Sequence, residues 1–462
     1  MRELAARAAW ANAARRSLHI AAYCFTYVGA LWLCFVFARA HTRPPAVDPA
    51  VRRRQCAAFA ARTWENPGGV SRGLSYCIER FWAMRKAGED PYSLIDSPNV
   101  PGVRRQPVTG LSVPWHASFN RSDPGLSVWF SQGRLPYVGH LETSEWLVPE
   151  GYHQREGELR LAFIHGSGSQ ENARGADYAG LTMRLAKWTG APVFAFNFLT
   201  EPLAPWPANV RSIFQFLAHA LENGPEGPGR AGALVLVGDS EGTLVTMQTA
   251  LTALDPPTLR LLGYGQALRK PDEWLAGIIL SSAVVDVACE TPSFEWNCYD
   301  EARGTGDPDT GNCDRTPGLP EKRADCRWSY LEYFFGFPGI KMADRSTADA
   351  AWEARRDFFE QGLVSPLRAD LSALPPLLLL AGTRDYYYSD SPTLGELACR
   401  AGAHVEVFNV VGSFHDFIEY ADGCGGPGPM EEGQEAYRRV RAFVRRLAAA
   451  RRGPAGREPL VA

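Results

Sequence analysis

The sequence predicts an α/β protein with a mostly parallel, doubly wound sheet, preceded by one membrane-spanning helix. After residue 159, apolar runs rich in strand formers alternate with amphipathic helical segments. Such an alternation is typical of a parallel sheet covered by helices on both faces. Small-residue and polar motifs follow the ends of these runs, where a doubly wound fold places its functional site.

The chain has 462 residues, of which 45% are hydrophobic and 21% charged. This length and composition suit one large globular domain with appendages. With a formal net charge of −3, the chain has no global basic field that would indicate nucleic-acid binding, so we expect no nucleic-acid partner.

Residues 17–38 (SLHIAAYCFTYVGALWLCFVFA) form an apolar segment long enough to cross roughly 30 Å of hydrocarbon as a helix. Basic residues precede it, which favours a cytoplasmic segment 1–16 and a type II orientation. The remainder would then lie in the lumen of the endoplasmic reticulum or secretory pathway, or outside the cell. A cleaved signal peptide is the alternative, since Ala38-Arg39-Ala40 fits a cleavage site and would give a secreted protein.

Cysteine usage agrees with an oxidising compartment. Of ten cysteines, two lie in the apolar segment and eight lie beyond it in local groups: Cys56 and Cys77; Cys289, Cys298, Cys313 and Cys326; Cys399 and Cys424. An even number in loop-like sequence favours disulfides, with free buried thiols as the alternative. No spacing typical of a zinc site occurs, and we expect no metal or cofactor.

The elements that we expect are strands near residues 125–132, 159–165, 191–198, 233–239, 276–284, 376–382 and 404–411, and helices at about 208–222, from 241, and at about 430–451. Between about 287 and 369 the alternation breaks. This stretch holds four cysteines and a Gly/Asp/Pro-rich segment, which predicts an insertion over the top of the sheet. Residues 453–462 are expected to be a disordered tail.

Gly238-Asp239-Ser240-Glu241-Gly242 is a G-x-S-x-G motif that directly follows an apolar strand and opens a helix. This context is typical of a nucleophile elbow, a strained turn that raises a serine hydroxyl above the sheet edge. Glycines two positions either side of the serine avoid a collision of Cβ atoms in the turn.

A serine hydroxyl needs a base oriented by a third group. Asp385 lies just after the strand at 376–382, and His415 lies four residues after the strand at 404–411, so both lie at carboxyl ends of strands. We expect Ser240, His415 and Asp385 to act as nucleophile, general base and orienting acid. Asp390 on the same loop is an alternative acid, or caps the helix that follows.

His165-Gly166-Ser167-Gly168 follows the strand at 159–165. A loop of small residues exposes backbone N–H groups, and such donors stabilise the oxyanion of an acyl-transfer transition state. We expect the amides of Gly166 and Ser167 to form an oxyanion hole with that of Glu241.

Taken together, residues 159–450 resemble the hormone-sensitive-lipase-like family, also called α/β-hydrolase fold-3. HGSG resembles the family's HGGG motif, GDSEG resembles its GDSAG elbow, and the block at 365–391 and GSFHDF at 412–417 resemble its acid and histidine loops. The N-terminal anchor makes the chain similar to the arylacetamide deacetylase and neutral cholesterol ester hydrolase branch. The resemblance implies an α/β-hydrolase domain over 111–452, with its insertion as a lid, and a stalk and N-terminal cap over 39–110.

The resemblance also implies hydrolysis of a small-molecule or lipid carboxylic ester through an acyl-enzyme, without a cofactor. Three departures bear on the substrate: Ser167 stands where the family has glycine, Glu241 replaces an alanine, and the insertion is longer than expected. Alternatives are another acyl-group enzyme (a deacetylase, transacylase or amidase), a non-catalytic ligand receptor on the same fold, or an unrelated fold with accidental motifs. The sequence does not determine the oligomeric state.

Overall fold

The structure is a computed structural model, and its chain divides into two compact units, residues 1–54 and 55–462. It describes parts of the second unit only: residues 63–87, 89, 94, 100–108, 144–166, 176–198, 206–264, 268, 270–297, 327, 330, 331, 335 and 348–452. The predicted anchor (17–38), the strand near 125–132 and the tail (453–462) lie outside these residues. No helix in the described ranges is long and apolar enough to span a bilayer.

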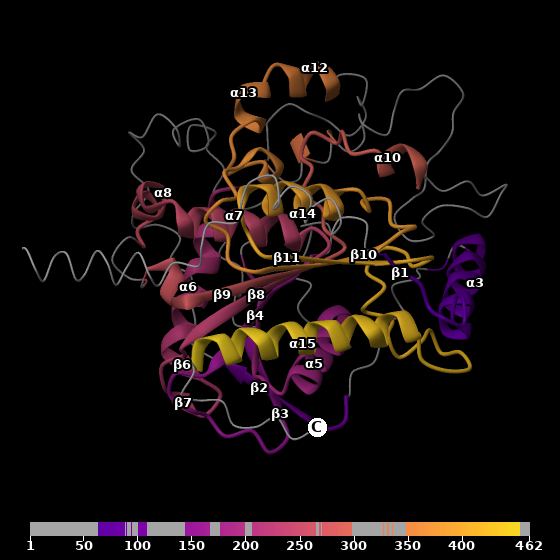
Figure 1. The fold of residues 1–462 in the computed structure, drawn as a ribbon, viewed down its shortest axis with the longest axis horizontal. Coiled ribbons are helices and arrows are strands. Elements are labelled where there is room, and N and C mark those ends of the chain that lie inside the picture. The colour runs from indigo at the N-terminus through magenta and orange to yellow at the C-terminus, as the bar shows by residue number, and fades with distance from the viewer. Residues whose placement is uncertain are drawn as a thin grey trace, which may run out of the picture. The chain divides into compact units, whose positions relative to one another are not determined.

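A nine-stranded sheet forms the centre of the described unit, in the order β1-β11-β10-β9-β8-β4-β5-β3-β2 (Figure 1). The strands are β1 (Thr63–Trp64), β2 (Val103–Val108), β3 (Ser144–Pro149), β4 (Leu159–Ile164), β5 (Val193–Phe196), β8 (Ala233–Asp239), β9 (Leu275–Ser281), β10 (Leu377–Gly382) and β11 (Val405–Val410). All neighbours pair in parallel except at β3, which is antiparallel to both β2 and β5. The predicted mostly parallel sheet is confirmed.

Helices cover both faces of this sheet (Figure 1). One face carries α6 (Ala208–Glu222), α7 (Gly242–Leu254) and α14 (Asp390–Ala401), and the other carries α3 (Arg72–Ala87), α5 (Ala176–Thr189) and α15 (Glu431–Arg452). Shorter elements are β6 (Asn223–Gly224), β7 (Gly227–Pro228), α8 (Pro256–Leu261), α9 (Pro271–Trp274), α10 (Ser293–Trp296), α12 (Ala348–Glu353), α13 (Arg356–Phe359) and the 3₁₀ turn η4 (Pro366–Arg368).

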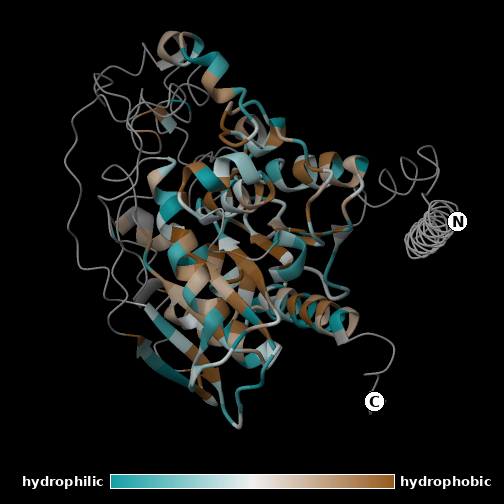
Figure 2. Ribbon diagram, turned by 90° about the vertical axis from the view of Figure 1, so that its left-hand side faces the viewer, coloured by the Kyte–Doolittle hydropathy of each residue, from teal (hydrophilic) through white to brown (hydrophobic). Residues whose placement is uncertain are grey.

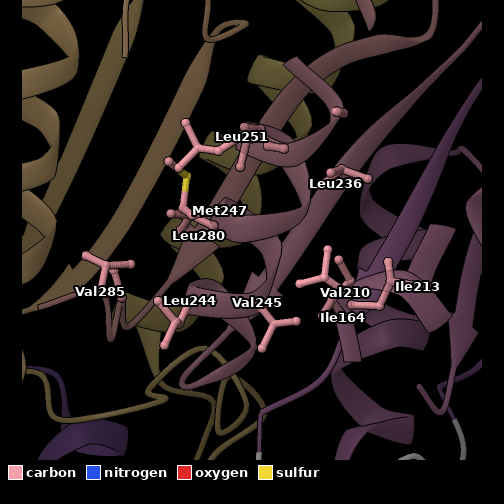
Figure 3. Packing of buried hydrophobic residues seen from close by; sticks show 14 of the residues in the cluster. Ile164, Val210, Ile213, Leu236, Leu244, Val245, Met247, Leu251, Leu280 and Val285 are labelled. Carbon is pink, nitrogen blue, oxygen red and sulfur yellow. The ribbon is translucent and has the colours of Figure 1, made fainter. Parts of the chain in front are cut away.

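Strand β8 shows why the sequence folds into two layers of helices around one sheet. All seven of its residues are buried, and successive side chains alternate between the two hydrophobic clusters. Leu234 and Leu236 belong to the cluster under α7, whereas Val235 and Val237 belong to the one under α5 and α15. Figure 2 shows the central strands as largely hydrophobic, and Figure 3 shows buried side chains of α7 beside those of the strands and α6.

The sheet begins earlier in the chain than the predicted domain start at residue 111. Strands β1 and β2 come from the stretch expected to be stalk and cap, and both pair into the main sheet. Sequence patterns did not indicate β2 (VRRQPV) because it is a half-exposed edge strand that contains two arginines and a proline. An edge strand of this kind lacks the apolar run by which central strands are recognised.

Disulfides occur among the described cysteines, and one of them joins two of the local groups. Cys77 on α3 pairs with Cys424 in the segment before α15, across 347 positions of sequence. Cys289 and Cys399 are also disulfide-bonded. Within the expected insertion, the structure describes residues 287–297, four single residues (327, 330, 331 and 335) and 348–369, so a lid remains a prediction.

Candidate active site

The turn between β8 and α7 has the geometry of a nucleophile elbow. Ser240 adopts a φ of 50°, in the left-handed region that non-glycine residues rarely occupy. Its amide donates to the carbonyl of Ser281 at 3.0 Å, which fixes the turn to the neighbouring strand β9. A Cβ atom on Gly242 would lie 2.4 Å from the carbonyl oxygen of Ile164, and one on Gly238 would lie 2.5 Å from Thr246 Oγ1. Both positions therefore require glycine.

The structure brings Ser240, His415 and Asp385 together from three separate loops. Ser240 Oγ lies 2.8 Å from His415 Nε2, and His415 Nδ1 lies 3.0 Å from Asp385 Oδ1. Ser240 is 9% exposed, and the other two are 1% exposed. A carboxylate at Nδ1 favours the tautomer that carries its proton there, so that Nε2 can accept the proton of the serine.

Asp385 and Asp390 have different partners, which separates the two candidate acids. Asp390 Oδ2 accepts hydrogen bonds from the amides of Val285 and Asp286, both at 2.8 Å, and Thr291 Oγ1 donates to its Oδ1 at 2.6 Å. Burial, followed by the nearby Asp286 carboxylate, raises the pKa of Asp390 well above its usual range. Asp390 thus ties the loop after β9 to α14, while Asp385 faces the imidazole.

Gly166 lies against the elbow, as the expected oxyanion loop requires. A Cβ atom there would lie 2.7 Å from the carbonyl oxygen of Asp239 and 2.8 Å from Ser240 Cβ. Glu241 is 6% exposed and precedes the first residue of α7, so its amide belongs to the helix N-terminus, where the helix dipole favours negative charge. Ser167 lies outside the described residues, and the oxyanion hole as a whole stays a prediction.

Two further residues support the site, and sequence reasoning missed them. Asn297 Nδ2 donates to the carbonyl oxygens of Thr383 and Asp385, at 2.9 and 2.8 Å, and so holds the acid loop in place. Asp416, next to the histidine, places its Oδ2 3.3 Å from His415 Nε2. Asp416 lies within the GSFHDF motif and could have been noticed there, whereas no local sequence pattern marks Asn297.

A cluster of three buried carboxyl groups lies beside the imidazole. Asp239, Asp416 and Glu419 each offer one oxygen, and these oxygens lie within 4.8 Å of one another. In the described part of the chain, this is the group of carboxyl, histidine or cysteine side chains whose ligand atoms lie close enough together to hold a cation. Burial raises the pKa of Asp239 to about 6, against the lowering effects of Ser281, His415, Glu419 and Asp416. Carboxyl groups at this spacing can share a proton.

Comparison with known proteins indicates the same fold. Residues 161–310 match a family model described as alpha/beta hydrolase fold. An acetyl-hydrolase of Streptomyces hygroscopicus is 28% identical over 313 residues, which cover 68% of this chain and 82% of that protein.

Solved structures with the same fold include two esterases. An esterase from the bacterial hormone-sensitive lipase family is 19% identical, with a TM-score of 0.53 over 82% of this chain and 99% of its own. A hyperthermophilic esterase of Pyrobaculum calidifontis is 17% identical, with a TM-score of 0.50 over 87% and 97%. The chain thus has the α/β-hydrolase fold, and its resemblance to the hormone-sensitive-lipase-like family is supported.

Proposed function

We propose that this protein is a serine hydrolase that cleaves carboxylic esters through an acyl-enzyme. The observation that carries the proposal is the hydrogen-bonded series from Ser240 Oγ through His415 to Asp385 Oδ1. Such an arrangement activates a hydroxyl that is otherwise a poor nucleophile. Relatives described as esterases and an acetyl-hydrolase act on the bond class that this chemistry suits.

In the proposed mechanism, His415 Nε2 accepts the proton of Ser240 as Oγ attacks the ester carbonyl. Asp385 stabilises the imidazolium that forms, and backbone amides of Gly166, Ser167 and Glu241 stabilise the oxyanion. The imidazolium then donates its proton to the leaving alcohol. Water, activated by the same imidazole, releases the acid and regenerates Ser240.

Labelling of the full chain with a fluorophosphonate probe tests this proposal directly. We expect Ser240 of the wild type to be labelled, and labelling to disappear in Ser240→Ala and His415→Ala. A panel of p-nitrophenyl esters from acetate to palmitate, with acetate first because of the acetyl-hydrolase relative, then defines the acyl group. A folded wild type that is not labelled would overturn the hydrolase assignment and favour a ligand-binding role.

The membrane anchor at 17–38 is a second part of the proposal, supported by its length and apolar composition. We propose that it tethers a lumenal or extracellular enzyme, as in the arylacetamide deacetylase branch. Alkaline carbonate should leave the full chain in the membrane pellet and release a variant that lacks residues 1–40. A mature N-terminus near residue 41, identified by mass spectrometry, would instead show a cleaved signal.

A further inference from the structure

The ring nitrogen that faces Ser240 also faces a second carboxyl group. His415 Nε2 lies 2.8 Å from Ser240 Oγ and 3.3 Å from Asp416 Oδ2. With the proton of the neutral ring on Nδ1, toward Asp385, Nε2 has a lone pair and no hydrogen. An ionised Asp416 is therefore favourable beside the imidazolium and unfavourable beside the neutral imidazole, whereas a protonated Asp416 is compatible with the neutral ring.

Backbone conformation and a hydrogen bond fix the position of Asp416. Its φ of 53° lies in the left-handed region, and its amide donates to Ser282 Oγ at 2.8 Å. Ser282 itself has a φ of 49°, and its amide donates to the carbonyl of Leu380. Strained backbone of this kind persists where the surroundings fix it, and it gathers at functional sites.

Protonation of Asp416 is coupled to the rest of the carboxyl cluster. Asp239 at the end of β8, Asp416 and Glu419 are at most 4% exposed, and one oxygen of each lies within 4.8 Å of the others. Three buried carboxylates at this spacing repel one another, so the cluster retains a proton at a higher pH than an isolated carboxyl would. Burial raises the pKa of Asp239 to about 6, while hydrogen bonds with Glu419 and Asp416 lower it, so the three groups are linked in their protonation.

Other charged groups around the cluster do not cancel this effect. Asp385 faces the far side of the imidazole. On α5, Arg184 donates to the backbone carbonyl of Glu419, but its guanidinium pairs with Asp422 at 2.7 Å. Tyr437 on α15 has its pKa raised by burial and donates its hydroxyl to the carbonyl of Ile418, so it adds no charge.

We propose that Asp416 is a second acid partner of His415, and that the proton it shares with Asp239 and Glu419 controls how much of His415 is available as the general base. This inference rests on the proposed function, since it concerns the same nucleophile. When Asp416 is ionised, the imidazolium is favoured, so at acidic pH a smaller fraction of His415 is neutral and able to accept the proton of Ser240. When the cluster places a proton on Asp416, the neutral imidazole is favoured, and a larger fraction of His415 is available at the same pH.

The test is the pH dependence of the second-order rate constant for fluorophosphonate labelling of the full chain, from pH 4.5 to 9. This rate reports the free Ser240–His415 pair without requiring the natural substrate. In Asp416→Asn, the acidic limb of the profile should move to lower pH by about one unit, because a carboxylate no longer favours the imidazolium. Glu396→Gln removes an exposed carboxylate on α14 that pairs with Arg400, away from the cluster, and should leave the limb in place.

Glu419→Gln gives an opposite expectation and serves if Asp416→Asn does not fold. Without the Glu419 charge, Asp416 loses its proton at lower pH, so the acidic limb should move to higher pH. If the acidic limbs of the folded variants superimpose on that of the wild type, the role of Asp416 is overturned. Labelling of the wild type in the same experiment would leave the hydrolase assignment intact. A wild type that is unlabelled at every pH would overturn both.

Discussion

Asp385 and Asp390 lie five positions apart, and their contacts predict that replacement by asparagine lowers the reaction rate strongly at Asp385 and little at Asp390. Asp385 Oδ1 lies 3.0 Å from His415 Nδ1 and also accepts the amide of Tyr387 at 2.7 Å. In Asp385→Asn, the amide oxygen can retain both contacts, so the main loss is the negative charge beside the imidazolium. At an effective dielectric constant of about 20, two unit charges about 3 Å apart interact by about 5 kcal/mol. This corresponds to a loss of about 10⁴-fold in rate.

Asp390→Asn is the matched control. Its neutral amide can accept the two backbone N–H groups of Val285 and Asp286 and donate to Thr291 Oγ1. Because burial already raises the pKa of Asp390 and so favours its neutral form, we expect a change in rate of less than about tenfold. Both variants should be followed by labelling rates at pH 8 and by thermal denaturation. Equal rates for Asp385→Asn and wild type, or an equally large loss in Asp390→Asn, would refute this assignment of the acid.

Three other substitutions test the elbow, the buried carboxyl and the disulfide. Gly242→Ala should lower the free energy of unfolding by about 3 kcal/mol or more in urea denaturation, because its Cβ meets backbone, whereas Gly428→Ala has open space and should be neutral. The pKa of Asp239 rises from 3.8 to about 6 on folding, so this group stabilises the wild type most at low pH. Its contribution to the free energy of unfolding, about 3 kcal/mol, should be lost as pH rises through that interval. Denaturation of Asp239→Asn at pH 4, 5 and 6 should not show this pH-dependent loss. Cys77→Ser should cost about 6 kcal/mol by the chain-entropy model, since the bond with Cys424 closes a loop of 347 positions. Calorimetry of wild type and variant measures this loss.

The centre of the fold could be predicted from sequence because buried parallel strands are apolar on both faces. The runs at 233–239 and 376–382 correspond to β8 and β10 within one residue, and the helix expected at 208–222 is α6. The nucleophile and histidine motifs could be located because each directly follows such a strand. Here local sequence and tertiary environment give the same signal.

The edges of the sheet and the supports of the site could not be predicted in this way. Strands β1 and β2 are short or half-polar and become strands only through their pairing with β11 and β3. Asn297 reaches the acid loop across 88 positions of sequence, and Ser282 supports Asp416 across 134. Contacts of this kind depend on how loops meet in space, which hydrophobic periodicity does not encode.

Strain in the site is distributed over adjoining strand ends rather than confined to the nucleophile. Ser240, Ser282 and Asp416 all have a φ near 50°, and each is fixed by a hydrogen bond to another strand end or loop: to Ser281, Leu380 and Ser282 respectively. Three such conformations cost on the order of 1–3 kcal/mol each. The apolar clusters on both faces of the sheet offset that cost, since the same strands that carry the loops are buried throughout. Because β8, β9, β10 and β11 hydrogen-bond side by side, their register fixes the loops at their ends relative to one another, including those that carry Ser240 and His415.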